Sequence, residues 1–299
     1  MRTVTIEELF LITFVLVDDW YQQKGQHLQN TRIGVKPVFT DSEILTLMLA
    51  TDFFGFTSER RYLAFIRANY LHLFPELPDQ SQFNRRSRKL RYLLEELRRH
   101  WAAEMGVRFE THFLLDTTPV VAVGYRRDKS RSSFSGSADY GYCSARRLKY
   151  FGYKLVMLTT LGGTPFAFEL VPANTDERDA ADEILDRLPS GSNVWSDKGF
   201  IGKDWQADWQ THGVYVWTAK RENQHDRNPP QFDRLLNSVR ERIEGAFDIL
   251  KEGGRSVERT LAITVEGLCS RVIAKISSVT FRLFLRKFFG IDTLTYTVT

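Results

Sequence analysis

The sequence predicts an α/β protein in which a mixed sheet is flanked by helices and preceded by an all-helical N-terminal domain. Over residues 1–105 apolar residues recur at helical spacing, whereas short β-rich runs bounded by Gly, Pro and polar clusters begin near residue 106. From residue 110 the expected order is three strands, helix, strand, helix, strand, helix, an antiparallel group followed by alternating units. We therefore expect two domains, 1–105 and 106–299, the second including a C-terminal helix.

The N-terminal domain is expected to hold four helices. Thr40 can cap the second, with Glu43 at the capping-box position three residues later. A third helix is expected over 58–70. The fourth begins near Ser81, which can cap it, and runs to about Glu104. Its first turns are rich in cations, which opposes the helix dipole and indicates either an anionic ligand such as phosphate or a solvated face.

The second domain is expected to alternate between the two element types. The β-rich runs are 113–115, 120–123, 151–161, 166–171, 193–196 and 214–217, and the helices are 177–188, 201–211, 232–251 and 262–288.

Composition is that of an ordinary globular protein. The chain has 299 residues, of which 42% are hydrophobic and 26% charged, which excludes disordered, collagen-like and disulfide-stapled classes. Two cysteines are too few for a disulfide framework and fit a reducing cytosol. Glu7 and Glu8 interrupt the N-terminal apolar run, and the 268–290 region is too charged to span a bilayer. We expect a cytoplasmic protein without a membrane segment.

Charge is unevenly distributed along the chain. The net charge is +4, but residues 106–155 hold nine basic and four acidic groups, and residues 156–231 hold seven and twelve. The basic segment indicates either a polyanion such as nucleic acid or a chance cluster on a solvated surface.

Three carboxylates are candidates for a common site. Asp116 and Asp197 each end an apolar run, at the strand ends where ligands collect in open α/β sheets, although a turn aspartate or helix cap is the alternative. Glu244 lies at the edge of the apolar stripe of the 232–251 helix, where an ordinary ion pair with Arg240 is the alternative. Together, such oxygen ligands suit two Mg²⁺ or Mn²⁺ ions, which can activate a water or a 3′-hydroxyl.

Several segments, taken in order, resemble one family. They are Gln82-Phe83-Asn84-Arg85-Arg86, Leu115-Asp116-Thr117-Thr118-Pro119, Gly141-Tyr142-Cys143, Phe151-Gly152-Tyr153-Lys154-Leu155, Ser196-Asp197-Lys198-Gly199-Phe200, and the set Arg240, Glu244 and Lys251. This order and spacing resembles bacterial insertion-sequence transposases of the DDE type, which have a ribonuclease H-like catalytic domain. The likeness is to the compact subgroup without an insertion domain.

The resemblance implies specific roles. It implies that Asp116, Asp197 and Glu244 bind the metal ions, and that Arg240 and Lys251 contact DNA near the scissile phosphate. Glu241 is a rival third carboxylate, but Glu244 keeps both cations in register. The partners implied are terminal inverted repeats and target DNA, synapsed by a homodimer associated with the nucleoid. Two positions depart from the fuller pattern, since relatives carry tyrosine at the positions of Asn237 and Phe200.

Other cations have two interpretations each. Lys154 is either a DNA backbone contact or a snorkelling lysine at a strand edge, and Lys198 is either a phosphate ligand or a surface cation. Seven cations flank a Ser/Gly-rich stretch that is either a flexible loop over DNA or a solvated loop. They are Arg126, Arg127, Lys129, Arg131, Arg146, Arg147 and Lys149.

The leading hypothesis is a transposase that cleaves element ends and joins the 3′-hydroxyl strand to target DNA. A catalytically idle DNA-binding protein derived from a transposase is one alternative. A ribonuclease H-like nuclease or resolvase is the other, because it shares the metal chemistry.

Overall fold

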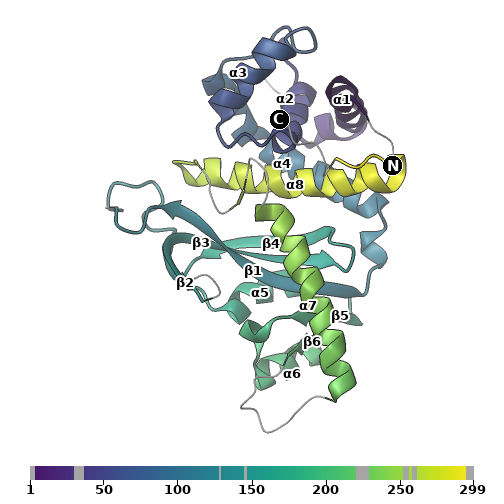
Figure 1. The fold of residues 1–299 in the computed structure, drawn as a ribbon, viewed down its shortest axis with the longest axis vertical. Helices are drawn as coiled ribbons and strands as arrows, with labels where there is room; N and C mark the ends of the chain where they lie inside the picture. The colour runs from purple at the N-terminus through teal and green to yellow at the C-terminus, as the bar shows by residue number, and fades with distance from the viewer. Residues whose placement is uncertain are drawn as a thin grey trace. The chain divides into compact units, whose positions relative to one another are not determined.

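A computed structural model describes residues 4–29, 37–127, 129–144, 147–219, 229–251, 256–257 and 261–293. The chain forms two compact units, one of Met1–Met105 with Leu250–Thr299 and one of Gly106–Ile249 (Figure 1). The expected division had placed the last fifty residues with the sheet, whereas here they group with the N-terminal helices. Among the helices of the described residues, none is both long and apolar enough to cross a membrane.

The first unit is built from helices. They are α1 Ile6–Gln23, η1 Gly25–Leu28, α2 Asp41–Ala50, η2 Thr51–Phe54, α3 Glu59–Asn69, α4 Gln80–Glu104 and α8 Val265–Phe289. The expected capping box is present at α2, where Thr40 and Glu43 satisfy each other's backbone N–H groups. The cap of α4 was assigned wrongly, because Asp79 rather than Ser81 accepts from the N–H of Gln82 at 2.8 Å. An acidic cap places negative charge at the positive end of the helix dipole, ahead of the cation-rich turns.

Helix α8 belongs to the first unit because it carries much of that unit's core. Trp101 of α4 stacks on Phe281 of α8 with ring centroids 4.6 Å apart. Lys275 of α8 donates to Asp52 at 2.7 Å, and both side chains are only 1% exposed. An amphipathic helix at the end of the chain thus closes the core that the first hundred residues begin.

The second unit contains one six-stranded sheet. Its strands are β1 His112–Val123, β2 Asp139–Cys143, β3 Leu148–Thr160, β4 Pro165–Pro172, β5 Ser192–Ser196 and β6 Val214–Thr218. The order is β2-β3-β1-β5-β6, with β4 paired to β3 beyond the end of β2. Strands β1, β3 and β4 are antiparallel, while β5 and β6 run parallel to β1. An antiparallel three-stranded group extended by two parallel strands is the expected ribonuclease H-like mixed sheet.

Strand β1 is longer than the sequence indicated. The two apolar runs 113–115 and 120–123 form one strand, so Asp116 lies inside β1 and not at its end. Pairing of β1 with β5 extends only from His112 to Leu115. Beyond that point no strand of the described residues pairs with β1 on its β5 side, and Pro119, which has no N–H to donate, lies in this stretch.

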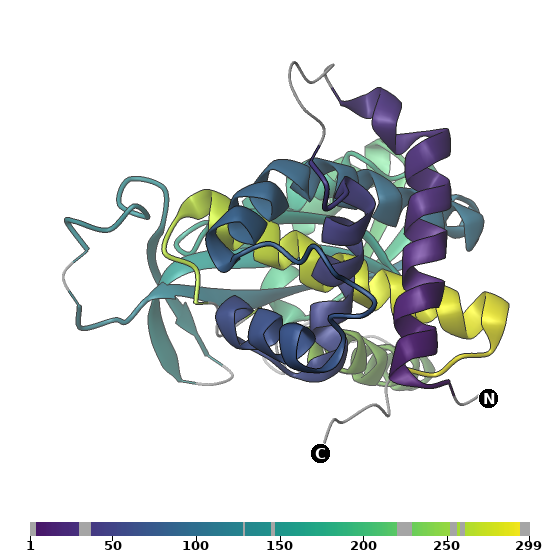
Figure 2. The same ribbon diagram turned by 90° about the horizontal axis from the view of Figure 1, so that it is seen from above.

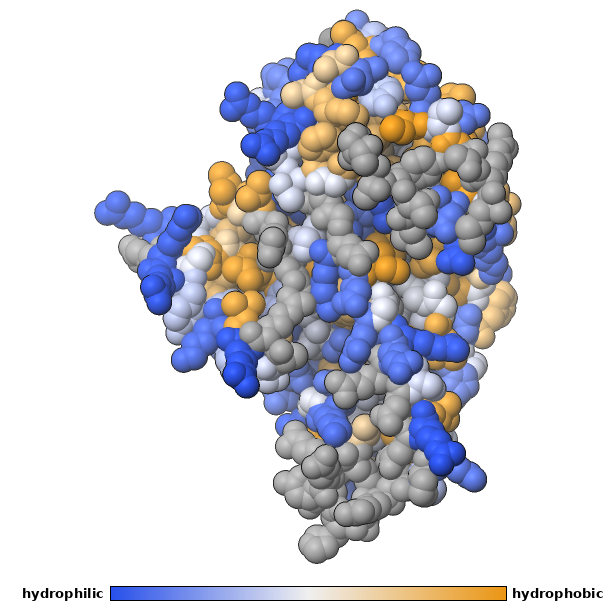
Figure 3. Space-filling model, viewed as in Figure 1, coloured by the Kyte–Doolittle hydropathy of each residue, from blue (hydrophilic) through white to orange (hydrophobic). Residues whose placement is uncertain are grey.

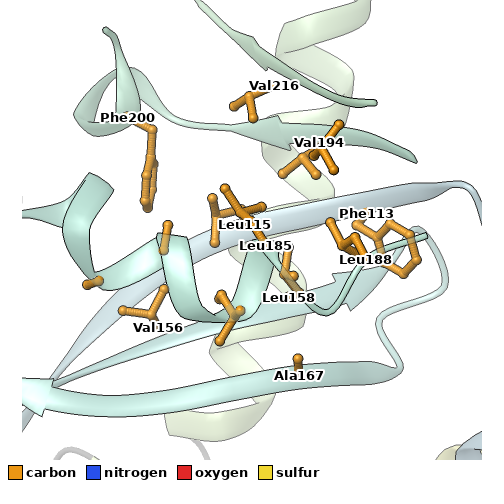
Figure 4. Close-up of a cluster of buried hydrophobic side chains, with 14 residues drawn as sticks. Phe113, Leu115, Val156, Leu158, Ala167, Leu185, Leu188, Val194, Phe200 and Val216 are labelled. Carbon is orange, nitrogen blue, oxygen red and sulfur yellow. The ribbon is translucent and has the colours of Figure 1, made fainter. Parts of the chain in front are cut away.

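One face of the sheet carries the main apolar cluster (Figure 4). Helix α5, Glu177–Leu185, contributes Ala180, Ala181, Ile184 and Leu185 to it. Trp205 and Trp209 of α6, Lys203–Thr211, pack against the same cluster. The strands supply alternate residues, such as Phe113 and Leu115 of β1, so this is the α5/α6 face.

The opposite face is covered in part by α7, Pro230–Lys251, which crosses the sheet in Figure 1. Phe232 of this helix contacts the rings of Trp195 in β5 and Trp217 in β6, at centroid distances of 6.2 and 5.6 Å. These tryptophans alternate with Val194 and Val216 of the apolar cluster, so they point to the other side. We call this side the α7 face.

A projection that we call the arm comprises residues 124–151, from the end of β1 through β2 into β3. It extends from one end of the sheet in both ribbon views (Figure 1 and Figure 2), and its tip is hydrophilic in Figure 3. The sequence indicated a flexible loop here, but part of it is β2, paired in register from Asp139↔Gly152 to Cys143↔Leu148. Phe134 is 2% exposed and packs edge-on against Tyr153, so the stretch before β2 is anchored to the sheet.

Candidate active site

Strand register brings Asp116 and Asp197 side by side. The parallel ladder of β1 and β5 ends with Leu115 opposite Ser196, so the next residue on each strand is an aspartate. Neighbouring strands lie about 4.8 Å apart, which makes these two carboxylates neighbours at the end of the ladder. Phe113 and Leu115 of β1 point into the apolar cluster on the α5/α6 face. Because successive side chains of a strand point to opposite faces, Asp116 points to the α7 face.

Local hydrogen bonds hold both aspartates. Oδ1 of Asp116 accepts from the backbone N–H of Thr117 at 2.7 Å. Oδ1 of Asp197 accepts from the N–H of Gly199 at 2.8 Å and caps the short helix η4, Lys198–Phe200. Asp197 is exposed and Asp116 is half-buried. Phe200, where relatives carry tyrosine, is fully buried in the apolar cluster. This departure from the family pattern therefore lies in the core of the sheet unit.

A further carboxylate, Glu177, adjoins Asp197 and was missed by the sequence analysis. It begins α5, and its Oε1 accepts from Oγ1 of Thr117 at 3.1 Å. Burial raises the pKa of Glu177 and the negative charge of Asp197 raises it further, while Lys154 acts against both. The available signal was an acidic residue five residues after the end of β4, but it was interpreted only as the start of a helix.

The third expected carboxylate, Glu244, lies on α7 and is exposed. Helix α7 begins over Trp195 and Trp217 on the α7 face, the face to which Asp116 points. Among the described residues, no group of three or more His, Cys, Asp or Glu lies close enough together to hold a metal ion. The strand register brings the two aspartates together. The contribution of Glu244 remains a prediction.

The chemistry of the aspartate pair suits a divalent cation. Mg²⁺ is commonly held by one or two carboxylates, with water and substrate phosphate completing its shell. Adjacent carboxylates also repel each other, and a cation between them relieves such repulsion. Asp116 and Asp197 thus fit Mg²⁺ or Mn²⁺ in donor type and number.

Two of the expected DNA-contacting cations have partners within the protein. Nζ of Lys154 donates to the carbonyl oxygen of Thr175 at 2.7 Å, at the start of α5. Arg86 donates to the carbonyl oxygen of Phe39 at 2.5 Å and to Asp41 at 2.7 Å. These contacts give both residues structural roles, whichever role they have toward DNA.

The remaining expected cations are distributed over several elements. Arg85 and Lys198 are exposed, on α4 and η4, and Lys251 is the last residue of α7 and half-buried. Arg126, Arg127 and Arg147 are exposed on the arm. Arg146 and the side chain of Arg240 lie outside the described residues.

The arm also carries exposed aromatic rings. Tyr125, Tyr140 and Tyr142 are 45%, 50% and 59% exposed. Nζ of Lys129 lies 5.0 Å from the ring centre of Tyr140 and 5.6 Å from that of Phe151. Cations interleaved with aromatic rings are typical of surfaces that bind nucleic acid.

Comparison with known proteins identifies the family. The sequence profile of the family described as Transposase DDE domain matches residues 107–274, more than half of the chain. The chain belongs to the DDE transposase family. Members of this family use divalent metal ions. No curated protein matches the chain. Among solved structures, it is similar to a piggyBac transposase in a synaptic complex with hairpin DNA, determined by cryo-electron microscopy. The identity is 12% and the TM-score 0.47, over 96% of this chain and 77% of that one.

Proposed function

We propose that this transposase cleaves DNA at the ends of a mobile element and joins the freed 3′-hydroxyl strand to target DNA. The observation that carries the proposal is the strand register that makes Asp116 and Asp197 neighbours, within the residues that the family profile covers. Asp116, Asp197 and Glu244 are the proposed ligands of two Mg²⁺ or Mn²⁺ ions. Such ions, when bound, activate the attacking oxygen and stabilise the leaving oxygen.

The protein's own groups would place the DNA against these carboxylates. Lys198 follows Asp197 directly and is exposed, so it can meet a phosphate beside the cut. Arg240 and Lys251 share α7 with Glu244 at spacings of four and seven residues, which places all three along one side of a helix. Lys154 holds the start of α5 through Thr175 and lowers the pKa of Glu177, so its proposed contribution includes the charge balance of the site.

The arm continues the same face as Asp116. Alternate residues of β3 share one side of the sheet, and the register pairs Met157 with Asp116 and Lys149 with Tyr142. Lys149 is eight residues from Met157, about 26 Å at 3.3 Å per residue. Because base pairs repeat every 3.4 Å, a duplex cut at Asp116 would reach the arm about eight base pairs away. The arm cations, with Arg126, Arg127, Arg146 and Arg147 among them, are the proposed contacts to this DNA.

The N-terminal helical domain is proposed to bind the terminal inverted repeats. Arg85 is exposed on α4, whereas Arg86 is engaged with Phe39 and Asp41, so Arg85 is the better candidate for a phosphate contact. A homodimer that synapses the two ends is also proposed, from the family resemblance.

The proposal is tested with Asp116→Asn. The substrate is duplex DNA taken from the flanks of the encoding sequence, and nicking is followed in Mg²⁺, in Mn²⁺ and with EDTA. The amide removes a charged ligand, so we expect nicking to fall roughly 1,000-fold, since a metal ion contributes several kcal/mol and each 1.36 kcal/mol is tenfold in rate. DNA binding should be retained.

The same assay separates the alternatives. Full nicking by Asp116→Asn would overturn the site assignment. Binding of element ends by the wild-type protein, without any cleavage in Mn²⁺, would identify a catalytically idle DNA-binding protein. Preferential cleavage of RNA–DNA hybrids or branched junctions over element ends would identify a nuclease or resolvase. Glu183→Gln, an exposed position on α5, is the matched control and should nick like the wild type.

A further inference from the structure

Glu177 lies in the first turn of α5, where the helix dipole favours a carboxylate but no cap is missing. The N-cap of α5 is already supplied by Asp176, whose Oδ1 accepts from the N–H of Arg178 at 3.0 Å. Two other acidic residues of the helix, Asp179 and Glu183, are exposed, whereas Glu177 is half-buried. The partial burial of Glu177, which the exposed acidic residues of the same helix do not share, calls for an explanation.

The contacts of Glu177 connect the two segments that carry the aspartates. Its Oε1 accepts from Thr117, the residue after Asp116, at 3.1 Å. Its other oxygen, Oε2, lies against Gly199, two residues after Asp197. The side chain therefore bridges β1 and the turn after β5 from the α5/α6 face, beside Asp197.

Gly199 shows how close this approach is. A methyl group added at Gly199 would clash with Oε2 of Glu177 and would lie 3.0 Å from Oδ1 of Asp197. Gly199 is not among the glycines with a positive φ, so its turn does not require the backbone freedom of glycine. The close approach of the Glu177 side chain explains the glycine better. The glycine in the Asp197-Lys198-Gly199-Phe200 segment thus makes room for the Glu177 carboxylate.

The negative charge of Glu177 is costly where it lies. Burial and the nearby charge of Asp197 both disfavour the ionised form, and Lys154 offsets only part of this. A glutamine would keep the hydrogen bond from Thr117 and fill the same space without that cost. The positive end of α5, in whose first turn Glu177 lies, favours the negative charge, and a divalent cation held by Asp197 would also gain from it.

We propose that Glu177 is a positioning residue for the Asp116–Asp197 pair: it holds the Asp197–Gly199 turn against β1 and supplies negative charge that favours a divalent cation there. The proposal rests on the proposed function, because that function places the cation between the aspartates. Glu177 acts through its neighbours Thr117 and Gly199.

The test compares Glu177→Gln with Glu183→Gln, a matched change at an exposed position on the same helix. The melting temperature is measured in EDTA and in increasing Mg²⁺. Without metal, Glu177→Gln should melt at or above the wild-type temperature, because a repelling charge is gone. Its stabilisation by Mg²⁺ should be much smaller, and half-maximal stabilisation should need about 10–100-fold more Mg²⁺, the usual effect of losing a group that supports metal ligands. Glu183→Gln should match the wild type in both conditions.

A conservative variant separates charge from shape. Glu177→Asp keeps the charge with a shorter side chain, so it should restore much of the Mg²⁺ response that Glu177→Gln loses. A purely structural role predicts instead that Glu177→Gln melts lower in EDTA and responds to Mg²⁺ like the wild type, and that result would overturn the proposal.

The melting assay reports on Glu177 independently of catalysis. If the wild-type protein is stabilised by Mg²⁺ but does not nick DNA, the proposed function fails while the role of Glu177 is still measured. If the wild type nicks DNA and the Mg²⁺ requirement of Glu177→Gln is unchanged, only the role of Glu177 fails. Absence of any Mg²⁺ stabilisation in the wild type would overturn the proposal for Glu177 as well.

Discussion

Two sets of carboxylates, one in each compact unit, differ in how their charge is compensated. In the helical unit, Asp52 is 1% exposed and is compensated by Lys275 at 2.7 Å and Arg282 at 3.5 Å. In the sheet unit, Glu177 adjoins another carboxylate, Asp197, and its pKa is raised by burial and by that neighbour. The first arrangement neutralises a charge inside the protein, whereas the second accumulates like charges.

The difference separates a charge that maintains the fold from carboxylates that we propose to bind a cation. A buried ion pair with good geometry is stable as it stands, and losing one partner is what destabilises the protein. Like charges held together raise the energy of the folded state, and they persist only if the surrounding structure enforces them. Here the enforcing structure is the register of β1 and β5 together with the Thr117–Glu177 hydrogen bond.

The largest effect on stability is expected from Lys275→Met. The substitution leaves Asp52 buried with one partner fewer, and breaking a buried pair in this way costs about 3–5 kcal/mol. Chemical denaturation of the full chain measures this loss of unfolding free energy. The double variant Asp52→Asn with Lys275→Met should recover much of it, because the uncompensated charge is then gone.

Asp197→Asn provides the contrasting measurement. It removes a carboxylate from the sheet unit, where like charges repel, so the unfolding free energy in EDTA should not decrease. If Asp197→Asn destabilises the protein as much as Lys275→Met does, the two sets of carboxylates do not differ in the way described.

A smaller effect is expected on DNA binding by the arm. Arg126 and Lys149 are exposed, and we expect each to neutralise one phosphate. Each phosphate contact contributes about 0.9 to the slope of log binding constant against log salt, so the Arg126→Ala, Lys149→Ala double variant should lower that slope by roughly 2. Fluorescence anisotropy of labelled duplex DNA at several salt concentrations measures the slope.

Lys203→Ala is the matched control for the arm. Lys203 is an exposed cation on α6, on the α5/α6 face and away from the face of Asp116. It should leave the salt slope unchanged. An equal decrease for Lys203→Ala would show that DNA binds without preference for the arm.

Much of the fold could be predicted because local chemistry determines it. The capping box of Thr40 and Glu43, the long amphipathic helices and the strands on either side of α5 all follow from spacing within short windows. Nonlocal features were missed. That 113–115 and 120–123 form one strand depends on β3 pairing across Pro119. That α8 completes the helical unit depends on contacts such as Lys275 to Asp52, which are 223 residues apart in sequence.

The site divides in the same way. That Asp116 and Asp197 lie on neighbouring strands could be predicted, because each follows an apolar run and parallel strands bring such residues together; their role stays a prediction. Glu177 could not be separated from the start of a helix, because its significance comes from Thr117 and Gly199, which are distant in sequence. The hydrogen bonds of Arg86 to Phe39 and Asp41 likewise could not be predicted from its place in a cation-rich helix, because both partners are distant in sequence.

The smallest expected effect concerns His100 in the helical unit, a titratable side chain whose positive charge is only partly favoured by its surroundings. Burial lowers the pKa of His100 and the charge of Lys24 lowers it further, although Glu104 acts in the opposite direction. A histidine with a lowered pKa in the folded state resists protonation, so the unfolded state takes up the proton first. Its contribution to stability is complete above the ordinary pKa of about 6.5, and it is lost as the pH falls through that value toward the folded-state pKa.

Melting temperatures of the wild type and of His100→Gln, measured from about pH 8 to about pH 5, test this. The wild type should lose slightly more stability on acidification than His100→Gln, by far less than Lys275→Met costs. The control position is His72, which is exposed and whose Nε2 lies 3.1 Å from Oε1 of Glu7. If His100→Gln loses as much stability on acidification as the wild type, then the compensated charges of the helical unit, rather than His100, govern its response to acid.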